Sequence, residues 1–214
     1  MQSLTGSRIF RSSNKGVIQM INSFQDLNSR FAQVASQPHA VTRKSAGAVG
    51  ELFEQLMIGG IVGNQSGADF VEIATEAKVH YRTGELTIFS CKGEGLKPSE
   101  IKAKRNKSTV RVGDGLTERG GQFVVEHNGE TLVAWDKATL VARIVEKMPN
   151  LAMVKATKKG ETVTFDALTV CRQIIPSRFI DSIRNGQVRI ELRSKGTSFR
   201  ANPDVIASWF ETVH

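Results

Sequence analysis

The residues of this sequence that could carry out a reaction lie between positions 54 and 78. Glu76 and Lys78 are separated by one residue, Asp69 precedes them, and Glu54 lies further upstream. Residues two apart on a β-strand point to the same face, so Glu76, Lys78 and His80 would form one charged face. A Glu-x-Lys triplet is common, and taken alone it also fits an ordinary strand at the edge of a sheet.

Together, the four residues contain the parts that phosphodiester hydrolysis needs. That reaction requires a divalent ion, an activated water and a proton donor for the leaving oxygen. Asp69 and Glu76 are predicted to bind Mg²⁺, which prefers oxygen ligands. Lys78 could orient the attacking water or help to deprotonate it, and could stabilise developing negative charge, with Glu54 as an auxiliary acid. Taken singly, Glu54 also fits a solvated helix and Asp69 a turn.

Composition favours a globular protein with a polyanionic partner. The chain has 214 residues, of which 40% are hydrophobic, and a net charge of +8. This is enough apolar material for one sizeable core, and the basic balance points to nucleic acid, although many basic proteins only have solvated surfaces. With no membrane-length apolar run and no signal-like segment at the start, we expect a cytoplasmic, soluble protein without membrane contact.

Other chemistries are excluded by motif. The two cysteines and four histidines are scattered, which fits neither a disulfide framework nor the ligand spacing of a zinc site. The sequence has no phosphate-binding loop and no dinucleotide fingerprint, so no nucleotide cofactor is expected.

The elements that must position the four residues can be read from local patterns. Apolar steps of three and four predict a helix over 17–34, and Ser45 is expected to cap a second helix that carries Glu54 and stops at Gly59. Extended sequence then runs through Tyr81, turns at 83–84 and continues as a second strand.

The second half of the chain mixes strands and helices. Residues 92–121 are basic, Gly-rich and without apolar periodicity, which predicts a long functional loop. Asn128-Gly129 predicts a hairpin turn. Further patterns predict helices over 138–148 and 176–186, strands over 151–165 and 187–193, and a terminal helix over 203–213. The chain therefore mixes helices and strands, and the predicted fold class is α/β in the broad sense that includes α+β.

At this point the sequence resembles a known family. The segments "GAVGELFEQLMIGG" and "ADFVEIATEAK" are similar to the active-site helix and strand of PD-(D/E)xK nucleases, in the MutH-like branch that includes the MvaI/BcnI-type restriction endonucleases. The segments "ELTIFSC", "GGQFVVEHNGETLVAWD" and "FIDSIRNGQVRIELRSKGTSFR" resemble later parts of the MvaI/BcnI type. Three positions differ: Ala77 stands where the family usually has Leu, and Cys91 and Lys195 stand where it has His.

The resemblance implies a restriction-endonuclease-like fold, with a mixed central sheet flanked by helices and a recognition lobe across a DNA cleft. Residues 1–45 would form an N-terminal helical segment and 46–214 the nuclease domain, with its catalytic part at 46–92 and recognition and remaining sheet at 93–214. It also implies a Mg²⁺-dependent, sequence-specific endonuclease on duplex DNA, a monomer that nicks one strand at a time. The alternatives are a MutH-like repair nicking enzyme, a catalytically silent DNA-binding protein of the same fold, and a basic structural protein.

Two groups of basic residues are candidates for DNA contact. The first group has no interleaved aromatics, which favours the duplex backbone over single strands, with a solvated loop as an equal alternative. The second surrounds Gly196, where Arg200 could read guanine or pair with a carboxylate inside the fold. The candidates are Lys102, Lys104, Arg105 and Lys107 in the first group, and Lys195, Thr197 and Arg200 in the second.

Overall fold

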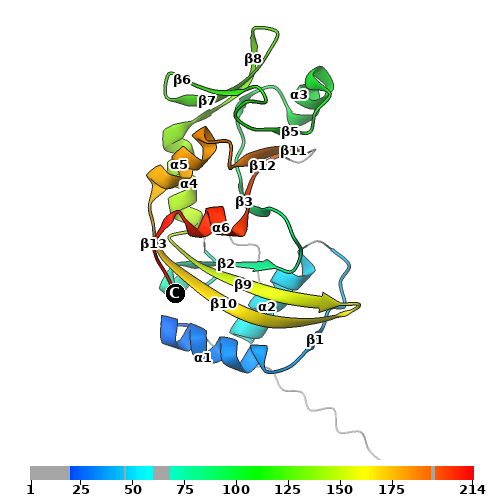
Figure 1. The fold of residues 1–214 in the computed structure, drawn as a ribbon, viewed down its shortest axis with the longest axis vertical. Helices are drawn as coiled ribbons and strands as arrows, with labels where there is room; N and C mark the ends of the chain where they lie inside the picture. Colours follow the sequence, from blue (N-terminus) through cyan, green and yellow to red (C-terminus); the bar gives the residue numbers. More distant parts are fainter. Residues whose placement is uncertain (1–19, 46, 60–67, 194–195) are drawn as a thin grey trace, which may run out of the picture.

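The structure is a computed structural model that describes residues 20–45, 47–59, 68–193 and 196–214. The molecule is elongated, and its three sheets follow one another along the long axis (Figure 1). This mixed α/β architecture confirms the predicted fold class. Within these ranges, no helix has the length and apolarity needed to cross a membrane.

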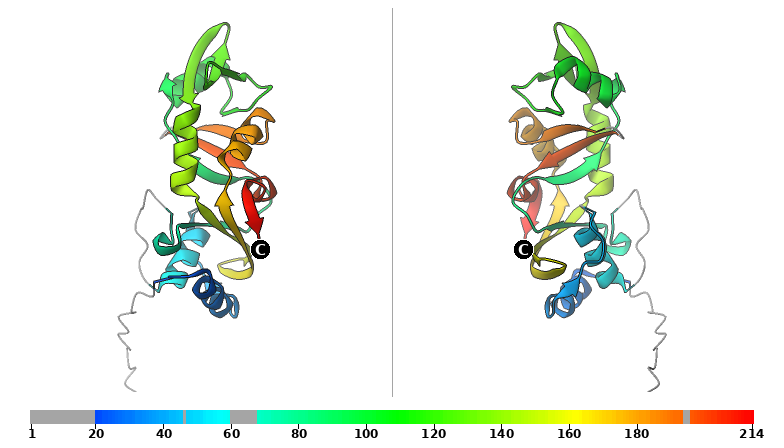
Figure 2. Two further views of the ribbon diagram at one scale, coloured as in Figure 1. Left: turned by 90° about the vertical axis from the view of Figure 1, so that its left-hand side faces the viewer. Right: turned by 90° about the vertical axis from the view of Figure 1, so that its right-hand side faces the viewer.

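One end of the molecule is built on a five-stranded sheet. Its order is β1-β10-β9-β2, with β13 paired to β10, and β2 runs parallel to β9. Helices α1 and α2 cover one face (Figure 2). The bounds are α1 Phe24–Ala35, β1 His39–Ala40, α2 Ala48–Ile58, β2 Thr75–His80, β9 Asn150–Lys159, β10 Thr162–Ile174 and β13 Phe210–Val213, with the short 3₁₀ helix η1 at Val71–Ile73.

Two four-stranded sheets form the other end. One has the order β3-β12-β11-β5 and the other β4-β8-β7-β6. Their strands are β3 Leu86–Ser90, β4 Glu94–Gly95, β5 Thr109–Val110, β6 Leu116–Arg119, β7 Gln122–His127, β8 Glu130–Asp136, β11 Arg189–Arg193 and β12 Gly196–Ala201. The helices here are α3 Pro98–Arg105, α4 Lys137–Lys147, α5 Pro176–Arg184 and α6 Pro203–Ala207.

Strand β9 is shared by two hydrophobic cores. Ala152 and Val154 belong to the core beneath α1 and α2, whereas Leu151 and Met153 belong to the core of the other end. Successive side chains point to opposite faces of a strand, and a strand with a parallel neighbour is commonly buried on both faces. Strand β2, which carries Glu76, therefore pairs with a strand that is packed on both faces.

Several sequence-based expectations are confirmed. Asn128 and Gly129 both have positive φ, 50° and 79°, as a tight hairpin turn requires, and they join β7 to β8. Gly59 ends α2 in the left-handed conformation. The helix predicted over 138–148 is α4. Helix α1 packs in the same core as α2, and the division of the chain at residue 45 stays a prediction.

Other expectations are wrong at their boundaries. The first helix begins at Phe24, because the Ser23 side chain accepts a hydrogen bond from the Asp26 amide at 3.0 Å and caps it. Residues 17–19 of the expected helix lie outside the described residues. Ser45 is not the cap of α2, which begins at Ala48 after Gly47.

Two segments were assigned the wrong structure. The expected loop over 92–121 contains β4, α3, β5 and β6, which are too short for apolar periodicity to reveal. The expected terminal helix ends at Ala207, and β13 follows it. Cys171 and Val213 pair in β10 and β13, so a sheet edge formed by a distant segment decides the conformation of the last residues.

Candidate active site

Glu76 and Lys78 lie side by side on β2, as their spacing predicts. The Lys78 ammonium Nζ is 2.5 Å from Oε1 of Glu76. Glu76 is 1% exposed, whereas Lys78 and His80 on the same face of β2 are partly exposed. Ala77 packs on the opposite side, in the core with α2. A buried carboxylate is tolerated only when other groups compensate its charge.

Asp69 reaches the same place by a reversal of the chain. Phe70 forms an isolated bridge with Thr75 across η1, and Ala74 takes a left-handed conformation with φ 46°. The Ala77 amide then donates a hydrogen bond to Oδ2 of Asp69 at 2.8 Å. Asp69 was expected at the start of the strand. It instead precedes η1 and is held beside β2.

A second lysine, which the sequence analysis missed, joins the two carboxylates. Nζ of Lys147 lies 2.8 Å from Oε2 of Glu76 and 3.8 Å from Oδ1 of Asp69. Lys147 stands in the last turn of α4, just before β9, and the parallel pairing of β9 with β2 brings that turn to the start of β2. Only this long-range pairing reveals its position.

Glu54, on α2, lies close enough to these groups to interact with their charges. The pKa of Glu54 is raised to about 7, mainly by burial and also by the neighbouring carboxylates of Asp69 and Glu76, against the opposing charges of Lys78 and Lys147. Burial also raises the pKa of Glu76, and Lys78 opposes that shift. Three acids and two lysines therefore share one electrostatic environment, and all four residues predicted from the sequence are part of it.

The acids fit a divalent ion in one specific sense. In the described part of the chain, no three acidic, His or Cys side chains form a metal cluster. Asp69 and Glu76 nevertheless converge on one cation, the Lys147 ammonium. Magnesium is commonly held by one or two carboxylates, with water and substrate phosphates as its other ligands. The pair thus fits Mg²⁺ that is bound together with a phosphate.

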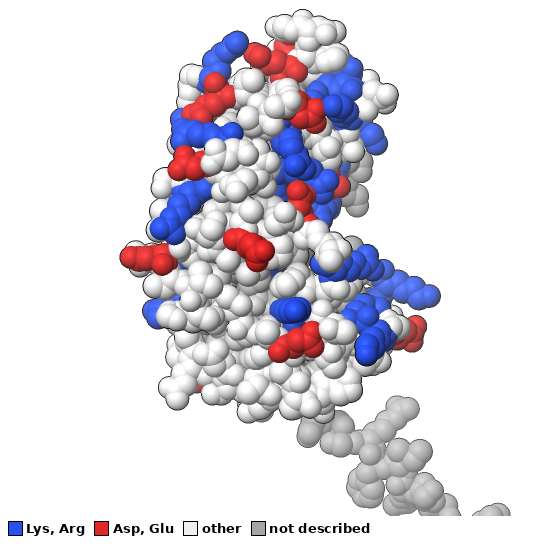
Figure 3. Space-filling model, in the orientation of Figure 1, with Lys and Arg blue, Asp and Glu red and all other residues white. Residues whose placement is uncertain are grey.

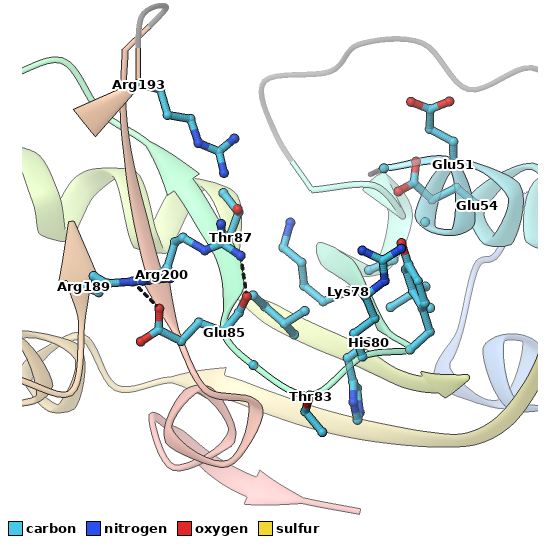
Figure 4. Close-up of a pocket in the computed structure, with 18 residues that line it drawn as sticks. Glu51, Glu54, Lys78, His80, Thr83, Glu85, Thr87, Arg189, Arg193 and Arg200 are labelled. Atoms are coloured by element: carbon cyan, nitrogen blue, oxygen red, sulfur yellow. Dashed lines mark hydrogen bonds and ion pairs between the residues drawn. The ribbon is translucent and has the colours of Figure 1, made fainter. Parts of the chain in front are cut away.

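A cleft of about 720 Å³ lies beside these residues. Glu51, Glu54, Lys78 and His80 line one side (Figure 4). The opposite side carries arginines of β11 and β12, namely Arg189, Arg193 and Arg200. The positive charge of these arginines is complementary to the negative charge of a nucleic-acid backbone.

Carboxylates hold the arginines of the far wall in place. Nε of Arg189 is 2.5 Å from Oε2 of Glu85. Nη1 of Arg200 is 2.9 Å from Oε2 of Glu191, and its Nη2 donates to the Glu85 carbonyl at 2.7 Å. Arg200 thus pairs with a carboxylate and also lines the cleft, and its contact with guanine stays a prediction.

The other predicted DNA contacts lie elsewhere. Two of these lysines form ion pairs: Lys104 with Glu130 and Lys107 with Asp114, both at 2.6 Å. Arg105 donates to the Asp114 carbonyl. Thr197 is 4% exposed and borders a separate cavity beside Cys91. Lys195 lies outside the described residues. Lys102, Lys104, Arg105, Lys107 and Thr197 are not among the residues that line the cleft.

The fold of the chain is similar to that of solved structures. The complex of restriction endonuclease MvaI with cognate DNA substrate matches with a TM-score of 0.70 and 18% identity, over 92% of this chain and 99% of that chain. MvaI in the absence of DNA matches with a TM-score of 0.47 and 14% identity, over 92% and 99% of the two chains. No protein-family model and no curated protein sequence matches the chain. The chain has the fold of the MvaI-type restriction endonucleases.

Proposed function

We propose that this protein is a Mg²⁺-dependent, sequence-specific endonuclease that hydrolyses phosphodiester bonds of duplex DNA in the cytoplasm. One observation carries the proposal: Lys78 lines a cleft whose opposite side is lined by arginines, and it is paired with Glu76, beside which Asp69 is held by the Ala77 amide. The solved structure with the similar fold is a complex with DNA, which supports duplex DNA as the partner.

Each residue has a chemical role in this proposal. Asp69 and Glu76 would hold Mg²⁺, which when bound neutralises charge that grows on the phosphate. Lys78 orients the attacking water and stabilises negative charge near the reacting phosphorus. Glu54, with a pKa of about 7, exists in both protonation states near neutral pH and serves as the auxiliary acid.

The test is cleavage of supercoiled plasmid and of larger phage DNA, with and without Mg²⁺. Wild-type protein should give discrete nicks or fragments only with Mg²⁺. Glu76→Ala should lower the rate by about 10²-fold or more, because it removes a metal ligand and the partner of Lys78. Glu130→Ala, which alters an exposed carboxylate outside the cleft, is the control and should cleave normally.

A catalytically silent DNA-binding protein of the same fold is the second candidate. The observation that favours it is the Lys147 ammonium, which already supplies the cation between Asp69 and Glu76. Selective DNA binding without cleavage under any Mg²⁺ concentration would support this candidate, and cleavage that survives Glu76→Ala would contradict the active site proposed above.

A further inference from the structure

A second basic surface lies beside the cleft, at the end of the molecule that contains α1 and α2. Four cationic residues, Arg43, Lys44, Arg82 and Lys158, line a cavity of about 260 Å³ between the segment after β1, the end of β2 and the tip of the β9–β10 hairpin. We call these four residues the hairpin-side patch. Figure 3 shows Lys and Arg side chains gathered at the right of the molecule, over this hairpin tip.

The hairpin-side patch is continuous with the cleft. Arg82 and its neighbour Tyr81 line both hollows. A linear polyanion that enters the cleft beside Lys78 can therefore continue past Arg82 and over the start of α2 toward Lys158. This path leads away from the arginine wall of β11 and β12.

The charges of the patch are largely uncompensated. Glu161 is the one acidic residue among the described residues that line the cavity. Arg43 pairs with Glu51 at 2.8 Å. Within the described ranges, Lys44, Arg82 and Lys158 form no ion pair: the Arg82 guanidinium lies 5.0 Å from the centre of the Tyr81 ring, and Lys158 donates to the Gly160 carbonyl. The lysines at positions 104 and 107, in contrast, are both paired.

We propose that the hairpin-side patch binds the phosphate backbone of duplex DNA outside the target sequence, where the duplex leaves the cleft past α2. The inference rests on the proposed function. Phosphate contacts position a duplex without reading its bases, so the patch would add affinity and orientation but no sequence preference. Tyr81, beneath a guanidinium, is the one aromatic residue lining the described part of the cavity, which disfavours single-strand stacking.

The experiment measures DNA affinity against salt concentration by fluorescence anisotropy, without Mg²⁺. The triple variant Lys44→Ala/Arg82→Ala/Lys158→Ala removes the three unpaired charges. The matched variant Arg119→Ala/Arg143→Ala/Arg184→Ala removes the same net charge from arginines that form ion pairs and line neither the cleft nor the patch. Each phosphate contact contributes about 0.9 to the slope of log K against log salt. The first variant should therefore lose about 2–3 from the slope, and the matched variant should keep the wild-type slope.

Duplex length gives a second readout. The same fluorescent duplex, carrying a cleavage site mapped with the wild-type protein, is extended on one side, on the other, or on neither. Extension on one side only should tighten wild-type binding, and the triple variant should lose that gain. Melting curves confirm that both variants fold.

The outcomes separate the two proposals. Equal slopes for both variants, or a larger loss in the matched variant, would overturn the patch while wild-type cleavage still supports the endonuclease. If the wild-type protein neither binds nor cleaves any duplex, the proposed function and the patch both fail.

Discussion

At the scale of single residues, the Glu76 carboxylate is the group whose burial must be compensated. It is held by Lys78 on one oxygen and Lys147 on the other. Removal of one partner from a buried ion pair leaves an uncompensated charge, which is strongly destabilising. Lys78 and Lys147 therefore determine together how well this region tolerates the buried charge of Glu76.

Lys147→Met tests this compensation. We expect the metal-free variant to lose about 1–3 kcal/mol of unfolding free energy at neutral pH, because Glu76 would keep only Lys78 as a cationic partner and Asp69 would lose the nearby Lys147 ammonium. Thermal melting in the presence of a chelator measures the loss. Added Mg²⁺ should restore more stability to the variant than to the wild type. Lys137→Met at the other end of α4, whose ion pair is more exposed, is the control, and equal melting of both variants would contradict the prediction.

Glu54 should make stability depend on pH. Its folded-state pKa of about 7 lies above the ordinary value of 4.5, so the folded state binds the proton more tightly than the unfolded chain. The contribution of Glu54 to stability is therefore fully present below pH 4.5 and is lost as the pH rises from 4.5 through 7.

The variant Glu54→Gln should remove this loss. We expect it to melt about 2–4 °C above the wild type at pH 8, on the order of 1 kcal/mol after allowance for partial solvent exposure, and to match the wild type at pH 5. Differential scanning calorimetry at the two pH values measures the effect. The same difference at both pH values would show that charge is not its cause. Activity with Mg²⁺ should fall in spite of the added stability.

At the scale of elements, the close approach of the chain around Gly93 to strand β8 fixes one end of the molecule. A Cβ at Gly93 would lie 2.4 Å from Cγ2 of Val133 and 2.8 Å from the Ala134 carbonyl oxygen. The backbone can therefore approach β8 there only if residue 93 has no side chain.

The substitution Gly93→Ala should cost about 1–3 kcal/mol, because a side chain and a backbone atom would have to move. Gly50→Ala is the matched comparison. Gly50 lies inside α2, and a Cβ there would meet no atom of the described residues within 4 Å. Alanine is a better helix former than glycine, so this variant should gain about 0.5–1 kcal/mol. Chemical denaturation measures the change in unfolding free energy of the two variants. A loss of stability in Gly50→Ala would contradict the prediction that a Cβ fits there without a clash.

At the scale of the whole molecule, the two ends and the cleft between them suit one duplex. Each chain supplies one Asp69-Glu76-Lys78 cluster in the part that the structure describes, and under the proposed function such a cluster would act on one scissile phosphate at a time. We therefore propose that the protein acts as a monomer and cuts the two strands in separate events.

A plasmid time course tests this. With protein limiting, nicked circles should accumulate before linear DNA, and the initial rate should be proportional to protein concentration. Sedimentation of the free protein should give a single species near 23.5 kDa. Direct conversion to linear DNA with a second-order dependence on protein would contradict the monomer.

By itself, the sequence determined the parts of this protein that depend on local chemistry. The Glu-x-Lys spacing, the end of α2 at Gly59, the Asn128-Gly129 turn and the periodicity of α4 are set by neighbouring residues, and the structure confirms them. Only the tertiary structure decided what depends on distant pairing. The parallel contact of β2 with β9 places Lys147 between the carboxylates, and β10 converts the chain end into a strand. The physical reason is that an ion pair or a strand pairing forms between residues that are close in space. When those residues are far apart in the chain, the local sequence around each of them does not indicate the contact.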